Sequence, residues 1–265
     1  MRLKLTSLLT IALSLGGAHI ASAADMPVKA PMAAVWSWTG FYIGGNVGYG
    51  WGNGDLSLVP GPGWAAFGNP ATDPGYLVAN GSPNLKLRGA LGGAQVGYNF
   101  QLNNVVLGAE ADFSFAGIDG GRTTGFIAPP PGALIDNRAF NESDRLRWLA
   151  TFRGRLGYAA QNFLIYATGG LAVGRHEFSQ TIFNAGNFNT NAGSVNSTKT
   201  GWTVGGGVEA KLTGNWTAKA EYLYVDLGSV NVFSDSNTAP GFGLTVNTSS
   251  KLTANILRAG LNYHF

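Results

Sequence analysis

The chain has 265 residues, a formal net charge of +3, 40 glycines and no cysteine. Charged residues make up only 12% of the chain and aromatic residues another 12%, a composition that excludes an intrinsically disordered protein. Without cysteine the fold cannot depend on disulfides, so hydrogen bonds and packing must stabilise it. The small net charge gives no reason to expect nucleic acid as a partner.

The N-terminus predicts an export signal over residues 1–23. A basic start, MRLK, precedes an apolar segment and a small-residue cleavage site, ASA. Removal of this signal takes away Arg2 and Lys4 and lowers the formal net charge to +1. Beyond it, no run of 18 apolar residues could form a membrane helix. We expect an exported chain in which residues 24–36 form a periplasmic segment and residues 37–265 form the folded domain.

The mature chain alternates apolar and polar residues with a period of two, which predicts β-strands with two different faces. In RLRWLATFRGRLGY, at 145–158, the even positions are apolar or glycine, whereas four odd positions are arginines. Such strands exceed the usual length of about 5–6 residues. They suit a tilted crossing of a bilayer, which needs about 9–11 residues. Eight strands are expected, over residues 39–51, 87–101, 104–116, 145–159, 163–178, 199–212, 216–229 and 251–265.

Short and long connections alternate between these strands. Three are short (LNN, AAQN and TGN), and four long ones, at 52–86, 117–144, 179–198 and 230–250, are rich in loop-forming residues. This alternation is typical of an outer-membrane barrel with short periplasmic turns. The sequence therefore predicts an all-β fold, an eight-stranded antiparallel transmembrane β-barrel with four long extracellular loops. The alternative, a soluble sandwich or lipocalin-like barrel, has shorter strands and buries its apolar face.

Outward-facing aromatic residues support the membrane barrel, because they gather at two levels, as two membrane interfaces require. The level at the short turns comprises Phe41, Tyr98, Phe100, Tyr158, Phe163, Trp216, Tyr263 and Phe265. The level nearer the long loops comprises Trp51, Phe113, Phe115, Trp148, Trp202 and Tyr224.

If the apolar face meets lipid, the charged face lies in the lumen, which eight strands leave only wide enough for side chains. Buried charges must then pair, because an isolated one is costly. The expected network comprises Glu110, Asp112, Arg147, Arg153, Arg155, Glu209, Lys211, Lys219, Glu221 and Arg258. Its neighbouring pairs on adjacent strands are Glu209 with Lys219, Asp112 with Arg147, and Glu110 with Arg153. Six cations against four anions would give any ion leak a slight preference for anions.

No catalytic, metal or cofactor site is expected. Glu110 and Asp112 share one strand face, but they lie too deep in the lumen for a glycosidase and suit ion pairs better. His176 and His264 are the only mature histidines, and no serine is a strong partner for either in a hydrolase triad. They also lack the carboxylate spacing of a metal site.

Three cations, Lys86, Arg88 and Arg175, fall at the expected extracellular rim. They are candidates to contact lipopolysaccharide phosphates through charge-assisted hydrogen bonds. A solvated rim without a partner is the alternative.

Four stretches of the chain form recognisable motifs: WTGFYIGGNVGYGWG at 38–52, GAQVGYNFQ at 93–101, TFRGRLGYA at 151–159 and the final RAGLNYHF. They resemble the alphaproteobacterial outer-membrane β-barrel family of porin-like, immunogenic surface proteins, which is related in fold to the OmpA membrane domain. The start of the expected mature chain, ADMPVKAP, is similar too. The resemblance implies an integral outer-membrane protein folded by the barrel-assembly machinery. It also implies that Tyr263 and Phe265 form the signal which that machinery recognises.

We therefore expect a non-enzymatic barrel in the cell outer membrane of a Gram-negative bacterium, with outer-membrane lipid and lipopolysaccharide around it. Its expected role is structural, in envelope integrity and as a surface antigen, with a salt-bridge network filling the lumen. A small porin that passes ions or small solutes is the alternative. Binding of a ligand or host surface by the loops is a further alternative. The oligomeric state is unknown from the sequence, as is whether residues 24–36 plug the barrel.

Overall fold

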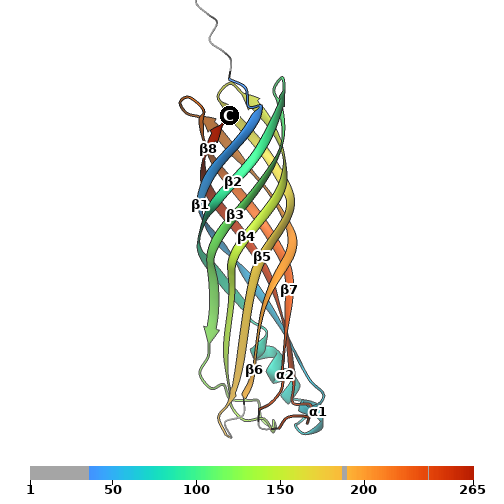
Figure 1. Cartoon of the computed structure of the whole chain (residues 1–265). Coiled ribbons are helices and arrows are strands. Elements are labelled where there is room, and N and C mark those ends of the chain that lie inside the picture. Colours follow the sequence, from blue (N-terminus) through green and yellow to red (C-terminus); the bar gives the residue numbers. More distant parts are fainter. Residues whose placement is uncertain (1–35, 187–189, 238) are drawn as a thin grey trace, which may run out of the picture. The chain divides into compact units, whose positions relative to one another are not determined.

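The computed structural model describes residues 36–186, 190–237 and 239–265, so the expected export signal and residues 24–35 lie outside the described residues. Trp36–Phe265 forms one compact unit, a closed barrel in which each strand pairs with the next and β8 pairs with β1 (Figure 1). All eight pairings are antiparallel. The predicted all-β, eight-stranded antiparallel fold class is therefore confirmed.

The strands are β1 (Gly40–Pro60), β2 (Asn84–Leu102), β3 (Val105–Thr123), β4 (Arg138–Ala160), β5 (Phe163–Asn184), β6 (Thr190–Lys211), β7 (Trp216–Ser234) and β8 (Val246–His264). Two short helices, α1 (Gly63–Ala66) and α2 (Asp73–Gly81), lie in the β1–β2 connection. Neither is long and apolar enough to cross a membrane, and no other helix occurs in the described part of the chain.

Three tight turns join β2 to β3, β4 to β5 and β6 to β7, where the sequence predicts short connections. Each turn contains a residue in the left-handed region, with φ of 54° at Asn103, 53° at Gln161 and 56° at Gly214. Asn and Gly adopt this conformation at low cost, which is why they mark tight hairpins.

The strands are longer than predicted, at 19–23 residues each. Much of each predicted long loop is therefore strand, and the predicted boundaries are wrong at the loop end. The cause is visible in β1, where Leu56 and Leu58 face inward while Asp55 and Ser57 face outward. Small polar residues, typical of loops, here form the outer face of a strand.

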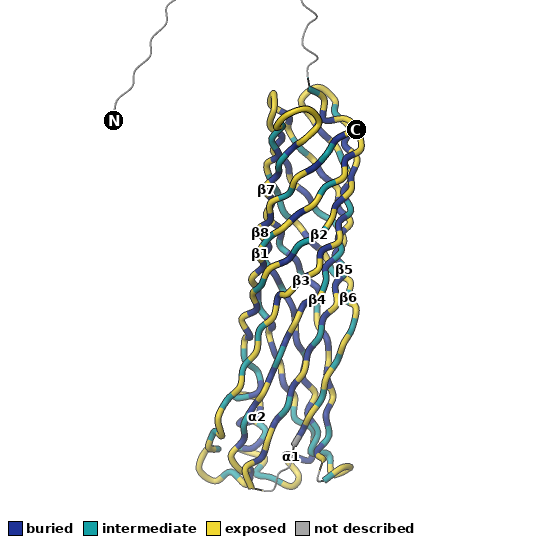
Figure 2. Tube along the Cα trace, turned by 60° about the vertical axis from the view of Figure 1, so that its left-hand side comes forward, coloured by how far each residue is buried: buried dark blue, intermediate teal, exposed yellow. Residues whose placement is uncertain are grey.

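Buried and exposed residues alternate along the strands over the whole length of the barrel (Figure 2), but the polarity of the two faces reverses. Near the tight turns, exposed residues such as Phe152 and Leu156 are apolar and the inward residues are charged. Near the loops, exposed residues such as Asn141 are polar and inward residues such as Leu146 and Phe178 are apolar. We call the part near the loops the extension and the rest the membrane tier. The extension comprises residues 52–60, 84–90, 117–123, 138–147, 174–184, 190–201, 227–234 and 246–254.

Register shifts lie at the boundary between the two tiers. One separates Leu146 from Leu149 in the pairing of β4 with β5, and another separates Asp226 from Ser229 in β7. A β-bulge inserts an extra residue and so exchanges the faces of the strand beyond it. In β4 the odd positions from Leu149 onward face inward. On the loop side of the bulge, from Arg138 to Leu146, the even positions face inward instead. Leu146, predicted to face outward with the other even positions, therefore faces inward.

Aromatic side chains pair on the outer surface at two levels of the membrane tier. At the tight-turn level, ring centroids are 4.7 Å apart for Phe41 and Tyr98 and 5.3 Å apart for Trp216 and Tyr263. At the level next to the extension, the rings of Phe113 and Trp148 are stacked with centroids 5.8 Å apart, and the centroids of Trp202 and Tyr224 are 5.4 Å apart. The structure thus brings together aromatic residues at both predicted levels.

Candidate functional site

Eight charged side chains form one layer inside the membrane tier, and each is at most 6% exposed. They come from five strands of the ring. The four cations are Arg153, Arg155, Lys219 and Arg258, and the four anions are Glu110, Asp112, Glu209 and Glu221. We call this set the charged layer. Because its formal charges balance, it gives no basis for the anion preference that the sequence suggested.

Arg153, on β4, is at the centre of the charged layer. Its Nη1 donates to Glu221 at 3.0 Å and its Nη2 donates to Asp112 at 2.9 Å. Nη2 also contacts Glu110, which stands opposite Arg153 in the β3–β4 register, as expected from the sequence. Its Nε donates to the hydroxyl of Thr151 at 2.8 Å. One guanidinium therefore holds three carboxylates from two sides of the lumen, the multi-donor geometry for which arginine is suited.

The other central contacts cross the lumen. Lys219, on β7, donates its Nζ to both oxygens of Glu110, on β3, at 2.9 and 2.8 Å. These strands are four places apart in a ring of eight, so the pair spans the barrel. Arg258 donates to Glu221 at 2.6 Å and to Asp112 at 2.9 Å. Ion pairs therefore connect opposite walls as well as neighbouring strands.

Glu209 stands opposite Lys219 in the register, as predicted, but its ionic partner is a different residue. Arg155 donates Nη2 to Glu209 at 2.8 Å, and the side chains of Thr217 and Asn262 donate to its other oxygen. Register alone fixes which residues are adjacent. In a narrow lumen, long side chains can also form ion pairs with residues on more distant strands. Lys219 pairs with Glu110 in this way, and Glu209 pairs with Arg155 instead.

Tyr42 connects an anion and a cation of the charged layer. Its hydroxyl donates to Glu110 at 2.7 Å and accepts from Arg155 Nη1 at 2.8 Å. The guanidinium of Arg155 also lies 3.9 Å from the ring centroid of Tyr166, a cation–π contact. Nothing in the strand alternation distinguished these two tyrosines from others, although both occupy inward positions beside the charges.

Two predicted members of the network are absent from it. Arg147 faces outward because of the β4 bulge, and its Nε pairs with Glu177 at 2.6 Å on the outer surface. The predicted pair of Asp112 with Arg147 is therefore wrong. Lys211 lies at the tight-turn end, where its Nζ is 4.3 Å from the ring centroid of Trp36. No carboxylate of the described residues lies within salt-bridge distance of Lys211.

Apolar clusters lie in the lumen on both sides of the charged layer. On the tight-turn side, Trp38 is fully buried and packs with Val106, Ala159, Leu164 and Tyr166. On the loop side, a large cluster begins in the membrane tier with Leu223 and Ile256 and continues through the extension, where it includes Leu56, Leu87, Ile118, Leu146, Phe178, Leu227 and Leu252. The charged layer is therefore enclosed between two apolar layers.

A second polar layer lies inside the extension. His176 Nε2 is 2.6 Å from one oxygen of Asp144, and Ser250 donates to the other oxygen. Because Asp144 lies between them, the serine and histidine do not form a nucleophile–base pair. Glu142 pairs with Arg122 at 3.0 Å. The sequence pattern did not predict this layer, because much of the extension has the composition of a loop. The described residues contain no group of three or more metal-binding side chains.

The other predicted residues lie on the outer surface. In the extension, Lys86 donates to Asn53 at 3.0 Å and Arg175 donates to Asn196 at 2.7 Å, while Arg88 is exposed between β1 and β3. At the other end of the barrel, the rings of Tyr263 and Phe265 are 5.2 Å apart. The amide of Phe265 donates to the carbonyl of Phe41 at 2.9 Å, which extends the contact of β8 with β1.

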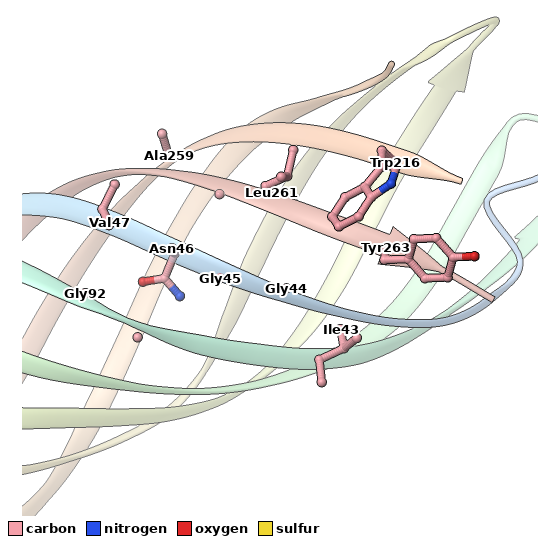
Figure 3. A pocket seen from close by; sticks show the side chains of 12 residues that line it. Ile43, Gly44, Gly45, Asn46, Val47, Gly92, Trp216, Ala259, Leu261 and Tyr263 are labelled. Carbon is pink, nitrogen blue, oxygen red and sulfur yellow. The ribbon is translucent and has the colours of Figure 1, made fainter. Parts of the chain in front are cut away.

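A groove of about 870 Å³ lies over β1, β2 and β8 and is bordered by the start of β7. Its walls include Ile43, Leu261 and Trp216, and its floor is mainly glycine (Figure 3). Val47 and Asn46 point to opposite faces of β1, and Val47 is on the outer face with the groove. The groove is therefore an apolar depression on the outer wall of the membrane tier, separate from the charged layer.

Comparison with known proteins places this geometry in a family. Residues 10–265 match the model of the outer membrane protein beta-barrel domain. The 31 kDa outer-membrane immunogenic protein of Brucella melitensis is 37% identical over 257 residues, which cover 92% of this chain and 93% of that protein. The 22 kDa outer membrane protein of Rhizobium leguminosarum is 29% identical over 212 residues, covering 79% of this chain and 74% of that protein.

Solved structures similar to this chain include neisserial surface protein A, with a TM-score of 0.41 and 14% identity over 86% of this chain and 98% of that one. Another is OprG from Pseudomonas aeruginosa, with a TM-score of 0.43 and 11% identity over 86% of this chain and 97% of that one. The family match spans the whole barrel and the Brucella relative aligns over nearly all of its own length. The chain therefore belongs to the outer membrane protein beta-barrel domain family and is a β-barrel protein of the bacterial outer membrane.

Proposed function

We propose that this protein is a closed structural barrel that contributes to envelope integrity and displays its connections as a surface antigen. The observation that carries the proposal is the charged layer, in which four cations and four carboxylates are buried in mutual contact between two apolar layers. An eight-stranded barrel leaves an interior that side chains can fill, and here they fill it. A small porin would need a continuous polar path, which the apolar cluster of the extension interrupts.

Conductance in a planar bilayer tests this proposal. The refolded wild-type barrel should pass no steady current, whereas steady current with ion selectivity would favour the small porin instead. An Arg153→Ala, Arg155→Ala variant identifies the sealing layer. Leakage would assign the seal to the ion pairs, and silence would assign it to the apolar cluster of the extension. Arg145→Ala, Arg147→Ala is the matched control, because both of these arginines are exposed outside the barrel.

A second proposed role is contact with lipopolysaccharide. The extension begins just beyond the aromatic level of Phe113 and Trp148, where lipid head groups would lie. Its outer surface over β2, β4 and β5 presents five exposed cations, Lys86, Arg88, Arg145, Arg147 and Arg175. Arginine and lysine donate charge-assisted hydrogen bonds to phosphate oxygens. Replacing Arg88, Arg145 and Arg175 by Gln should weaken lipopolysaccharide retention in native mass spectrometry, whereas Lys251→Gln on β8 should not.

The end of β8 supports the expected contact with the barrel-assembly machinery. The side chain of Phe265 is 75% exposed and meets Tyr263 edge to face on the outer surface. In the closed barrel the ring of Phe265 is therefore accessible to a partner, and the ring of Tyr263 is partly accessible. Phe265→Ala should slow assembly catalysed by that machinery in reconstituted vesicles while leaving spontaneous refolding in detergent unchanged. Equal slowing of both reactions would mean that the ring acts in the fold itself.

A further inference from the structure

A groove of about 470 Å³ lies on the outer wall of the extension, over β4, β5 and β6. Three of its lining residues are serines that the register aligns across these strands. Ser143 on β4 stands opposite Ser179 on β5, which stands opposite Ser194 on β6, and we call these three residues the serine row. Facing side chains on neighbouring strands lie about 4.5–5.5 Å apart, so the three hydroxyls form a continuous polar strip. The volume is within the range of about 300–1,000 Å³ that is typical of small-molecule sites.

Longer side chains border the serine row on its membrane side, where the register aligns Arg145, Glu177 and Asn196. Contacts within the chain hold this border in place. Glu177 accepts from Arg147 at 2.6 Å and from the side-chain amide of Asn196 at 3.2 Å. Asn196 in turn accepts from Arg175 at 2.7 Å. The border is therefore pre-organised, and with three guanidiniums around one carboxylate it is net positive.

The polar groups that face the groove are not used inside the chain. Among the described residues, no hydrogen bond or ion pair engages the hydroxyls of the serine row or the guanidinium of Arg145. Asn141 lines the loop side of the groove, and its oxygen accepts only a long hydrogen bond of 3.4 Å from Thr123. All of these groups belong to exposed or half-buried residues, so a molecule outside the barrel can reach them.

The two parts of the groove suit different chemical groups. A serine hydroxyl both donates and accepts hydrogen bonds, as does an asparagine amide, and sugar hydroxyls have the same double capacity. A guanidinium only donates, and it forms its strongest hydrogen bonds with phosphate or carboxylate oxygens. The groove therefore fits a ligand in which sugar hydroxyls lie beside an anionic group.

The height of the groove indicates the source of such a ligand. Along β4, Trp148 lies at the aromatic level, Arg145 follows three residues nearer the loops, and Ser143 lies two residues beyond it. At about 3.3 Å per residue, Arg145 lies just outside the hydrocarbon layer and the serine row lies further out. In a lipopolysaccharide, the phosphates of the lipid A head group follow the acyl chains, and the core sugars lie beyond the phosphates. The order of the groups along β4 matches this order.

We propose that the groove binds a core sugar of lipopolysaccharide, with the sugar hydroxyls on the serine row and Asn141 and the neighbouring phosphates on the arginines of the border. The inference rests on the lipopolysaccharide contact proposed above and deepens it, because it names the part of the molecule that the barrel distinguishes. The arginines alone would bind any phosphorylated lipid head group. The serine row adds selection for the sugar.

Native mass spectrometry of the refolded full-length protein in detergent micelles tests the proposal with two probes. One probe is a rough lipopolysaccharide with its core sugars, and the other is lipid A with the same acyl chains and phosphates. The wild type should retain the lipopolysaccharide at least five-fold more than lipid A. A Ser143→Val, Ser179→Val variant should lose this preference and retain lipid A as the wild type does.

The matched control is Ser57→Val, Ser249→Val, which changes two outward serines that face each other on β1 and β8, away from the groove. It should keep the wild-type preference. Valine suits a strand, and the heat-dependent migration of each variant on a gel checks that it is folded. If the serine-row variant does not fold, Ser194→Val takes its place and should lower the preference at least two-fold.

The outcomes separate the sugar site from the contact on which it rests. Equal retention of both probes by the wild type, an unchanged preference in a folded serine-row variant, or a lost preference in the control would overturn the sugar site alone. Retention of neither probe by the wild type would overturn the lipopolysaccharide contact and the sugar site with it. The same holds if replacing Arg88, Arg145 and Arg175 by Gln leaves the retention of lipid A unchanged.

Discussion

The membrane tier and the extension are built from the same eight strands, yet their walls have opposite polarity. In the membrane tier the apolar side chains face outward and eight buried charges face the lumen. In the extension the outer face carries polar residues, and the lumen is filled mainly by leucine, isoleucine, valine and phenylalanine. The first arrangement suits lipid outside, and the second is that of a small soluble barrel in water.

The difference shows that alternation identifies a strand without revealing which face is buried. The surroundings of the barrel decide that, and they change where the strands leave the membrane. In β4 the change coincides with a bulge at Arg147, which moves the apolar residues to the inside. In β1 no register shift is needed, because the inward positions change from Tyr42 and Asn46 to Leu56 and Leu58 on the same face.

Removing the central cation of the membrane tier should have the largest effect on stability. Arg153→Ala would remove the contacts of one guanidinium with Glu110, Asp112 and Glu221, and would leave the four buried carboxylates of the charged layer with only three cations. Breaking a buried ion pair by removing one partner typically costs about 3–5 kcal/mol. We expect a loss of that size in urea unfolding of the barrel in lipid vesicles. A loss near zero would mean that water enters the lumen and screens the carboxylates.

The matched control is Arg147→Ala on the same strand. Arg147 pairs with Glu177 on the outer surface, and its side chain is 48% exposed. Exposed ion pairs contribute about 0–1 kcal/mol, so this loss should be several-fold smaller than that of Arg153. Equal losses would contradict the placement of the β4 bulge.

The apolar core of the extension provides the next largest effect. Leu146 is fully buried there, and Leu→Ala substitutions in well-packed cores cost about 2–5 kcal/mol. Leu146→Ala should therefore loosen the extension, and we expect faster hydrogen exchange in the loop-side parts of β4 and β5. Val59→Ala, on the exposed outer face of β1, should change exchange little. Similar effects from both variants would show that the extension has no packed interior.

A charge on the outer wall tests where lipid ends. Phe152 and Asn141 both face outward on β4, one in the membrane tier and one in the extension. Arginine on the lipid face of a barrel costs about 2–4 kcal/mol at the bilayer midplane. Phe152→Arg should approach that cost in vesicle unfolding, whereas Asn141→Arg should stay within about 0.5 kcal/mol. A large cost at Asn141 would extend the membrane into the extension.

Much of the membrane tier was predictable from the sequence because short-range rules govern it. Period-two alternation, tight turns and aromatic levels indicated eight strands, and separate sequence motifs such as TFRGRLGYA carried the family resemblance. Eight of the ten expected network residues lie in the charged layer, including Glu110 beside Arg153. The partner choices were less predictable. Glu209 was correctly placed opposite Lys219, but which cation meets which carboxylate depends on reach across a closed lumen.

The extension was predicted poorly for two physical reasons. Glycine, asparagine and serine favour loops in isolation, so stretches such as 190–201 concealed strands whose outer face meets water. The bulge in β4 also changes the faces midway, and nothing in RLRW marks the place, so Arg147 and Leu146 were assigned to the wrong sides. The serine row was missed because its members lie in stretches with the composition of loops, and only the register aligns them.

The smallest expected effect is on the pH dependence of the extension. Burial raises the pKa of Glu142, and the attraction of Arg122 only partly offsets this. A carboxyl whose pKa is higher in the folded state binds protons on folding. The free-energy cost of burying its charge is therefore absent at low pH, and it grows as pH rises through the raised pKa. Glu142→Gln should therefore make the extension slightly more stable at neutral pH and leave it unchanged at pH 4. Hydrogen exchange, corrected for the intrinsic rate at each pH, measures this difference.

Arg122→Gln should have the opposite sign, which makes the pair of variants diagnostic. Without the guanidinium, nothing offsets the burial of Glu142, so its pKa should rise further and stability at neutral pH should fall. The double variant Arg122→Gln, Glu142→Gln should behave like Glu142→Gln alone, because Arg122 has no buried carboxylate to stabilise once Glu142 is replaced. If Glu142→Gln instead destabilised the extension at neutral pH, the ion pair would outweigh burial. The polar layer of the extension would then be held by charge, as the membrane tier is.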